Sequence, residues 1–203
     1  MSPHDCELIR LTFPAQPVAA FTALAFVVAG VWTIGRRRTT GPLVFGLSLV
    51  VLGATSFWFH AEAGAPASAA ESLAVIATMA WLAVWASSRP DVRAVWVWLA
   101  TVAAAGLVIG IAPATRHGLT AAAIAAFAVG AIRNPRLRRD RRMATALGIF
   151  SGALVVYVLS RTGGPWCDPA SPIQGHGLWH LLSALALVFV GEATGASEKG
   201  TPA

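Results

Sequence analysis

Long apolar stretches recur along the whole chain and are separated by short polar connections. An α-helix needs about 20 mostly apolar residues to cross the hydrocarbon core of a bilayer. Seven such stretches are present, so we predict an all-α integral membrane protein built as a seven-helix bundle. The predicted spans are 17–34, 42–61, 66–88, 94–112, 117–132, 143–160 and 172–194. Residues 1–16 and 195–203 are left as tails, and residues 1–203 form one membrane domain.

The basic residues predict the orientation of the bundle. Twelve of the fifteen Lys and Arg residues fall in the first, third and fifth connections or in the C-terminal tail. The other three are Arg10, Arg116 and Arg161, on the opposite side. Because cytoplasmic connections are enriched in basic residues, we expect the N-terminus outside and the C-terminus in the cytoplasm.

Composition narrows the class of protein further. The chain is 56% hydrophobic and 12% charged, with a formal net charge of +6. In a membrane protein, the arginine-rich segment 133–142 is expected to lie against anionic lipid, and no nucleic-acid partner is predicted. Arginine outnumbers lysine fourteen to one and alanine is abundant, which favours a GC-rich bacterial genome and the bacterial cytoplasmic membrane. The first apolar stretch is followed, not preceded, by its basic cluster, so it is expected to stay on the mature chain.

Two pairs of glycines four residues apart lie inside predicted spans. Gly106 with Gly110, and Gly148 with Gly152, have the spacing that lets two membrane helices approach closely. We therefore expect close helix packing at both pairs.

Both cysteines fall on the predicted outer side. Cys6 lies in the N-terminal tail and Cys167 in the connection before the last span. An oxidising compartment would let the two thiols pair, so we expect a disulfide across the mouth of the bundle. Two free thiols are the alternative.

The start of the last span carries its own signals. Ser171, Pro172 and Gln174 have the pattern of an N-cap, a first-turn proline and a capping-box partner. His176 would then fall in the second helical turn. His180 follows four residues later on the same face, about 6 Å further along the helix. This spacing lets two imidazoles bind one ion.

Four ionisable side chains lie in otherwise apolar segments near the predicted outer ends of three spans: His60, Glu71, His176 and His180. Each such side chain costs about 2.5–3.5 kcal/mol at a helix centre, so a cluster needs a compensating partner. Any one of them alone would be interpreted as an interhelical hydrogen-bond former. Their convergence at one depth instead predicts a zinc site. Ser56 shares the helix face of His60 and adds a further polar group.

These residue types together point to hydrolysis. Three neutral imidazoles leave a tetrahedral zinc ion one open position, at which water is activated near neutral pH. Glu71 is predicted to accept the water proton and return it to the leaving group. Alternatively, it is predicted to contact one of the metal ligands without binding the metal itself. Ser56 is predicted to donate a hydrogen bond to the developing oxyanion. An amide, or with less support an ester, is the expected substrate.

The order and spacing of these residues match a known pattern. It comprises Ser56 and His60 four residues apart, an acid at Glu71, and a closing segment that runs from Cys167-Asp168-Pro169 to His180. The pattern resembles the alkaline ceramidase family, within the CREST superfamily of seven-helix membrane hydrolases that also includes the progestin and adiponectin receptor proteins. The stretch from Cys6 to Gly30 is similar to the start of that family, so the resemblance spans nearly the whole chain.

The resemblance implies that His60, His176 and His180 bind zinc and that Ser56 assists at the metal. It also implies that Cys6 pairs with Cys167. One departure concerns the acid, which is normally aspartate in the family. Glu71 is one methylene longer, which puts catalytic competence in question and leaves open whether the carboxylate contacts the metal.

A second departure concerns the calcium site of the family, which is rich in Asp, Glu and Asn. Here Glu7 and Asp5 match its acidic character. Gln16 and Ala20 stand where acidic or amide ligands are expected. Zinc is the predicted metal, and calcium is left open by these departures.

The function predicted from the sequence is a zinc-dependent, ceramidase-like membrane hydrolase that cleaves a lipid amide. The alternative is a lipid-binding seven-helix receptor or pseudoenzyme with a structural zinc, which the altered acid at Glu71 favours. A transporter, a photoreceptor or a bis-histidine haem protein fits the seven spans and little else. A retinal Schiff base needs a buried lysine, whereas the single lysine of the chain is Lys199 in the tail.

Overall fold

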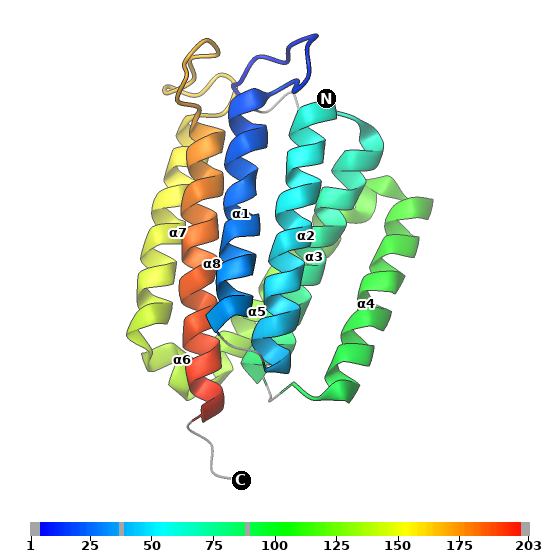
Figure 1. The fold of residues 1–203 in the computed structure, drawn as a ribbon, viewed down its shortest axis with the longest axis vertical. Coiled ribbons are helices and arrows are strands. Elements are labelled where there is room, and N and C mark those ends of the chain that lie inside the picture. Colours follow the sequence, from blue (N-terminus) through cyan, green and yellow to red (C-terminus); the bar gives the residue numbers. More distant parts are fainter. Residues whose placement is uncertain (1–4, 37–38, 88–89, 200–203) are drawn as a thin grey trace.

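The computed structural model describes residues 5–36, 39–87 and 90–199, and these form an all-helical bundle (Figure 1). The elements are α1 (Pro17–Arg36), α2 (Thr40–Glu62), α3 (Ala65–Ser87), α4 (Val92–Ile111), a 3-10 turn (Pro113–Thr115), α5 (Arg116–Arg133), α6 (Pro135–Arg139), α7 (Arg141–Leu159) and α8 (Gly175–Lys199). Within the described ranges, seven of these helices are long and apolar enough to cross a membrane, the fifth when the 3-10 turn is counted with α5. The predicted class, a multi-pass helical membrane protein, is confirmed.

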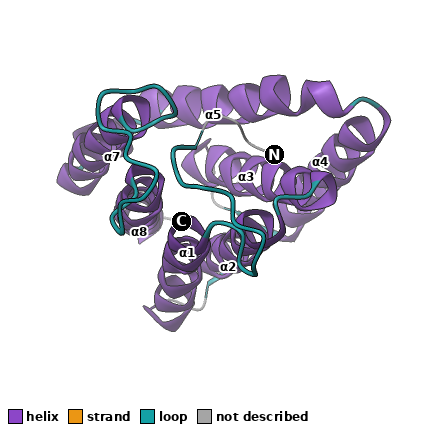
Figure 2. Ribbon diagram, turned by 90° about the horizontal axis from the view of Figure 1, so that it is seen from above, coloured by secondary structure: helices purple, strands orange, loops and turns teal. Residues whose placement is uncertain are grey.

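The helices differ in how deeply they are packed. Helix α1 packs against α2 and α8, while α3 packs against α2, α4 and α5. Seen from above, α3 lies between α5 and α2, and α4 lies at the edge of the bundle (Figure 2). Helices α2 and α8 have the largest share of buried residues, and α4, α5 and α7 have the smallest. The first described residues and the end of α8 lie at opposite ends of the bundle, as an odd number of spans requires (Figure 1).

Glycines bring α1 and α2 into close contact. A Cβ atom added to Gly46 would lie 2.7 Å from the carbonyl oxygen of Gly30, and one added to Gly53 would lie 2.8 Å from the backbone nitrogen of Val27. Both positions therefore require the smallest residue, because a backbone atom stands where the side chain would begin.

The glycine pairs singled out from the sequence do not have this role. A Cβ atom added to Gly110, Gly148 or Gly152 would meet nothing within 4 Å, and one added to Gly106 would make only ordinary contact with Leu73 at 3.4 Å. The expectation of close packing at these pairs is wrong, because Gly110, Gly148 and Gly152 are exposed and Gly106 meets only a side chain of α3 at ordinary distance.

The N-terminal segment, residues 5–16, folds back over one end of the bundle. Its backbone pairs with the end of α2, where Ala15 N donates to Ala61 O and Gln16 N donates to His60 O, both at 2.9 Å. A disulfide joins Cys6 to Cys167 in the connection before α8, as expected. The segment is thus attached to two sites that are far apart in the sequence.

Glu7, in the N-terminal segment, caps the start of α1. Its two carboxylate oxygens accept hydrogen bonds from Val18 N and Ala19 N, each at 2.8 Å. The first N–H groups of a helix lack partners within the helix, and a carboxylate there also interacts favourably with the helix dipole. The buried Glu7 therefore acts as a cap contributed by the N-terminal segment.

Helix α8 begins later than predicted. It starts at Gly175, and Leu178 N donates to Gln174 O, so Gln174 occupies the capping position instead of Ser171. The Ser171 hydroxyl accepts from Ile173 N in a local turn, and the Gln174 amide donates to the carbonyl oxygens of the preceding loop. The predicted capping box is wrong because both polar side chains are used within the loop. His176 consequently lies in the first turn of α8, not the second.

We expect Gly46→Ala to destabilise the protein by roughly 1–3 kcal/mol, because its new methyl group meets the backbone of α1. Gly148→Ala is the matched control, since the same methyl group there meets nothing within 4 Å. Thermal unfolding in detergent measures both variants. Equal melting temperatures for the two would contradict the close α1–α2 contact.

Candidate metal centre

Three histidines from two helices meet inside the bundle. His60 lies near the end of α2, and His176 and His180 lie in the first turns of α8. One ring nitrogen from each of the three lies within 4.8 Å of the other two. His60 is 1% exposed and His180 is 3% exposed, so water does not solvate these rings. The predicted convergence is confirmed for the three histidines, and the fourth residue, Glu71, is not part of this group.

His60 is oriented by Gln16. Its Nδ1 lies 3.0 Å from the Gln16 side-chain oxygen, which can only accept, so Nδ1 carries the proton and donates it. The orientation of the Gln16 amide is fixed in turn, because its nitrogen donates to Glu7 O at 3.1 Å. With the proton on Nδ1, the Nε2 lone pair of His60 faces the centre of the cluster.

His180 has the same arrangement with a backbone partner. Its Nδ1 lies 3.1 Å from Ala19 O in the first turn of α1. The Thr22 hydroxyl lies 3.3 Å from the same nitrogen. A carbonyl oxygen requires a donor, so Nδ1 of His180 is protonated as well. Nε2 is again the nitrogen that is left for a ligand.

His176 faces a carboxylate. Its Nδ1 lies 3.3 Å from Asp5 Oδ1, at an angle that makes the contact electrostatic and not a hydrogen bond. The Asp5 side chain is 5% exposed, so this charge is held out of water beside the imidazole. The Tyr157 ring packs on the other side of His176, with 5.8 Å between ring centroids.

The distance between two of the imidazole nitrogens is close to that between two ligands of one metal ion. His60 Nε2 and His176 Nε2 lie 3.2 Å apart. Two nitrogens bound to zinc at about 2.0–2.1 Å with tetrahedral angles would lie roughly 3.3–3.4 Å apart. Histidine ligands of metals almost always donate their other ring N–H to an oxygen atom. His60 and His180 do so here, whereas His176 Nδ1 only lies near the Asp5 carboxylate. The three imidazoles could therefore hold a metal ion, and the spacing between His60 and His176 is close to that of two zinc ligands.

Glu71 lies beside this cluster and is bound to Ser56. The Ser56 hydroxyl donates to Glu71 Oε1 at 2.7 Å. Because Ser56 is one helical turn from His60 on α2, this bond holds the carboxylate about one turn from the histidines. Ser56 has a single proton, which it gives to Glu71 in this arrangement.

Other acids have different partners. Glu62 accepts a hydrogen bond from Trp58 Nε1 at 2.6 Å on an exposed surface, and Asp168 accepts from Ala170 N at 3.0 Å within a turn. Both oxygens of Glu7 are engaged by α1, as described above. Among the His, Cys, Asp and Glu residues of the described ranges, the three histidines are the one group of three or more close enough to hold a metal ion. Calcium binding near Glu7 and Gln16 stays a prediction.

Sequence reasoning missed two residues that contact the histidines. Gln16 and Asp5 were considered only for calcium, yet they lie against His60 and His176. A signal existed for Asp5, because it precedes Cys6 and the disulfide brings it close to the start of α8. Gln16 immediately precedes α1, and only the fold of residues 5–16 reveals its partner.

The fold and the site together define a multi-pass membrane protein with a buried three-histidine centre. Comparison with known proteins gives no assignment, since no family model and no curated protein matches the chain. The function must therefore be argued from the site itself.

We expect Asp5→Asn and Gln16→Leu each to weaken zinc binding by about 10–100-fold, because the oxygen that orients a ligating imidazole is altered or lost. Competition with a chelator of known zinc affinity, on purified protein, measures the change. Asp168→Asn is the matched control and is expected to bind zinc as the wild type does, since its carboxylate serves a turn. Unchanged affinity in both Asp5→Asn and Gln16→Leu would contradict the orienting roles.

Proposed function

We propose that the protein is a zinc-dependent integral membrane hydrolase that cleaves an amide bond in a lipid. The observation that carries this proposal is the buried set of three imidazoles whose Nδ1 atoms all face oxygen atoms. The carboxylate of Glu71, held nearby by Ser56, supplies a base beside that set. The resemblance of this pattern to the alkaline ceramidase family supports a ceramide-like substrate.

Bound zinc supplies Lewis acidity, which polarises a carbonyl group and makes a nucleophile available at neutral pH. His60, His176 and His180 would hold the ion, and the oxygen partners of His60 and His180 keep these two rings in the tautomer that can ligate through Nε2. Glu71 accepts the proton of the attacking water at a carboxylate oxygen. It then returns this proton to the nitrogen of the leaving amine as the carbon–nitrogen bond breaks.

Ser56 is proposed to position Glu71. Its hydroxyl proton is already donated to the carboxylate, so the same proton does not serve a developing oxyanion in this arrangement. The hydrogen bond also compensates part of the cost of placing a carboxylate among apolar helices. This role replaces the oxyanion contact expected from the sequence.

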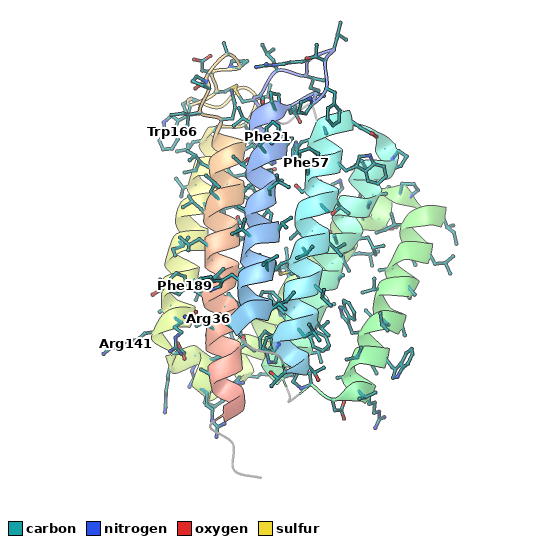
Figure 3. All side chains as sticks on the ribbon, in the orientation of Figure 1. Phe21, Arg36, Phe57, Arg141, Trp166 and Phe189 are labelled. Carbon is teal, nitrogen blue, oxygen red and sulfur yellow. A yellow bond between two sulfur atoms is a disulfide. The ribbon has the colours of Figure 1, made fainter. Side chains whose placement is uncertain are left out.

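A lipid substrate suits the surroundings of the site. Large aromatic side chains are exposed at the end of the bundle where the histidines lie, including Phe13, Phe21 and Trp166. Figure 3 places Phe21, Phe57 and Trp166 near this end. Aromatic residues are enriched where a membrane protein meets the lipid headgroups, so an amide just below the headgroup level would come close to the centre. From the distribution of arginines, we propose that this end faces outward from a bacterial cytoplasmic membrane.

We expect Glu71→Gln to lower hydrolysis by about 10²–10⁴-fold, because the amide side chain no longer accepts a proton. The zinc content should stay at the wild-type value, since Glu71 is outside the histidine cluster. Release of fatty acid from a short-chain fluorescent ceramide and from a panel of N-acyl lipids, in mixed micelles, measures the activity.

Glu62→Gln is the matched control, with the same change on an exposed acid of α2, and it should retain wild-type turnover. Wild-type turnover in Glu71→Gln would contradict the assignment of the base. Zinc-loaded wild-type protein that retains N-acyl lipids tightly but releases no product would favour the lipid-binding alternative instead.

A further inference from the structure

A cavity lies at the opposite end of the bundle from the histidines. It has a volume of about 300 Å³ and lies among the end of α1, the start of α2, the start of α7 and the end of α8. The residues that define its chemistry are Trp32, Arg36, Pro42, Arg142, Val188 and Glu192. Arg36 is labelled in Figure 3, towards the end of the bundle where α8 finishes.

The cavity combines two guanidinium groups with one carboxylate. Glu192 lies 3.7 Å from Arg36 and 3.8 Å from Arg142, and Asp140 lies 3.8 Å from Arg142. Charge-assisted hydrogen bonds are about 2.7–2.9 Å long, so these ion pairs are loose contacts. The two guanidinium groups converge on a single point from different helices, and arginine is the residue best suited to bind phosphate oxygens.

The remaining lining consists of Trp32, Thr33, Pro42, Val188 and Gly191, so part of the wall is apolar. Trp32, Pro42 and Val188 supply this surface, and Trp32 is 51% exposed on the outside of the bundle. Arg36 stacks over the Trp32 ring, 4.8 Å from its centroid. Tryptophan and arginine in this combination are typical of the boundary between hydrocarbon and headgroups. A soluble phosphate would use the arginines alone, whereas a phospholipid would also use the apolar walls.

We propose that this cavity binds the phosphate headgroup of one anionic phospholipid from the leaflet at the C-terminal end of the bundle. The volume is at the lower end of the range of small-molecule sites, about 300–1,000 Å³, which suits a headgroup and not a whole lipid. Basic pockets between helices on the cytoplasmic side of membrane proteins bind such headgroups. When no lipid is bound, the Glu192 carboxylate pairs with both arginines. When a lipid binds, the same carboxylate repels its phosphate and weakens the binding.

The test counts lipids retained by the full chain. The protein is purified from nanodiscs containing phosphatidylglycerol and phosphatidylcholine, and native mass spectrometry measures the bound lipid. We expect one phosphatidylglycerol per chain in the wild type. Arg36→Gln and Arg142→Gln should each weaken this binding by about fivefold or more. Glu192→Gln should strengthen it by a similar factor, and this gain keeps the test informative if an arginine variant fails to fold.

Arg139→Gln is the control for diffuse attraction, because this exposed arginine of α6 lies at the same end but outside the cavity. It should retain the lipid. Equal losses in Arg139→Gln and in the two cavity variants, or no phosphatidylglycerol on the wild type, would overturn the proposal. So would displacement of the lipid by millimolar inorganic phosphate, which would assign the cavity to a soluble phosphate.

Discussion

The contacts made by the Nδ1 atoms of three buried imidazoles are the constraint on which the rest of the structure depends. A polar ring inside a bundle of apolar helices is destabilising unless its nitrogens have partners. His60 is satisfied by Gln16, His180 by the carbonyl of Ala19, and His176 faces Asp5. Two of these oxygens belong to the N-terminal segment, at Asp5 and Gln16, and the third belongs to Ala19 in the first turn of α1. The N-terminal segment is therefore part of the site and not a tail. With Nδ1 of His60 and His180 donating, Nε2 is the nitrogen left for a ligand in both rings. Nε2 of His60 lies 3.2 Å from Nε2 of His176, a spacing that a shared metal ion would stabilise.

The N-terminal segment can supply these oxygens only because it is fixed at several points. Glu7 caps α1 through two backbone N–H groups, Gln16 pairs with the backbone of His60, and Cys6 is joined to Cys167. Glu7 also accepts the amide of Gln16, so the cap and the orientation of His60 depend on the same residue. The close glycine contact between α1 and α2 brings the start of α1 near the end of α2. Cap, disulfide, helix packing and histidine cluster are therefore mutually dependent.

The sequence predicted the parts of this structure that follow from composition and period. Seven spans follow from the lengths of the apolar stretches, and the histidine cluster follows from topology, since His60 ends one span and His176 begins another. The sequence could not predict contacts that depend on the path of an irregular segment, such as those of Asp5 and Gln16. It also misplaced the start of α8, because Ser171 and Gln174 have capping residue types but bind within the loop. The prediction of close packing at the glycine pairs of α4 and α7 was wrong, because spacing alone does not say which face of a helix meets a neighbour.

We propose that His60, His176 and His180 form a zinc site and that the bundle is a membrane hydrolase. Metal analysis by mass spectrometry tests it most directly, on detergent-purified wild type and on the His176→Ala/His180→Ala double variant. We expect one zinc per chain in the wild type and none in the double variant. A wild type that binds no metal even after reconstitution with zinc, or a double variant that keeps its zinc, would contradict it.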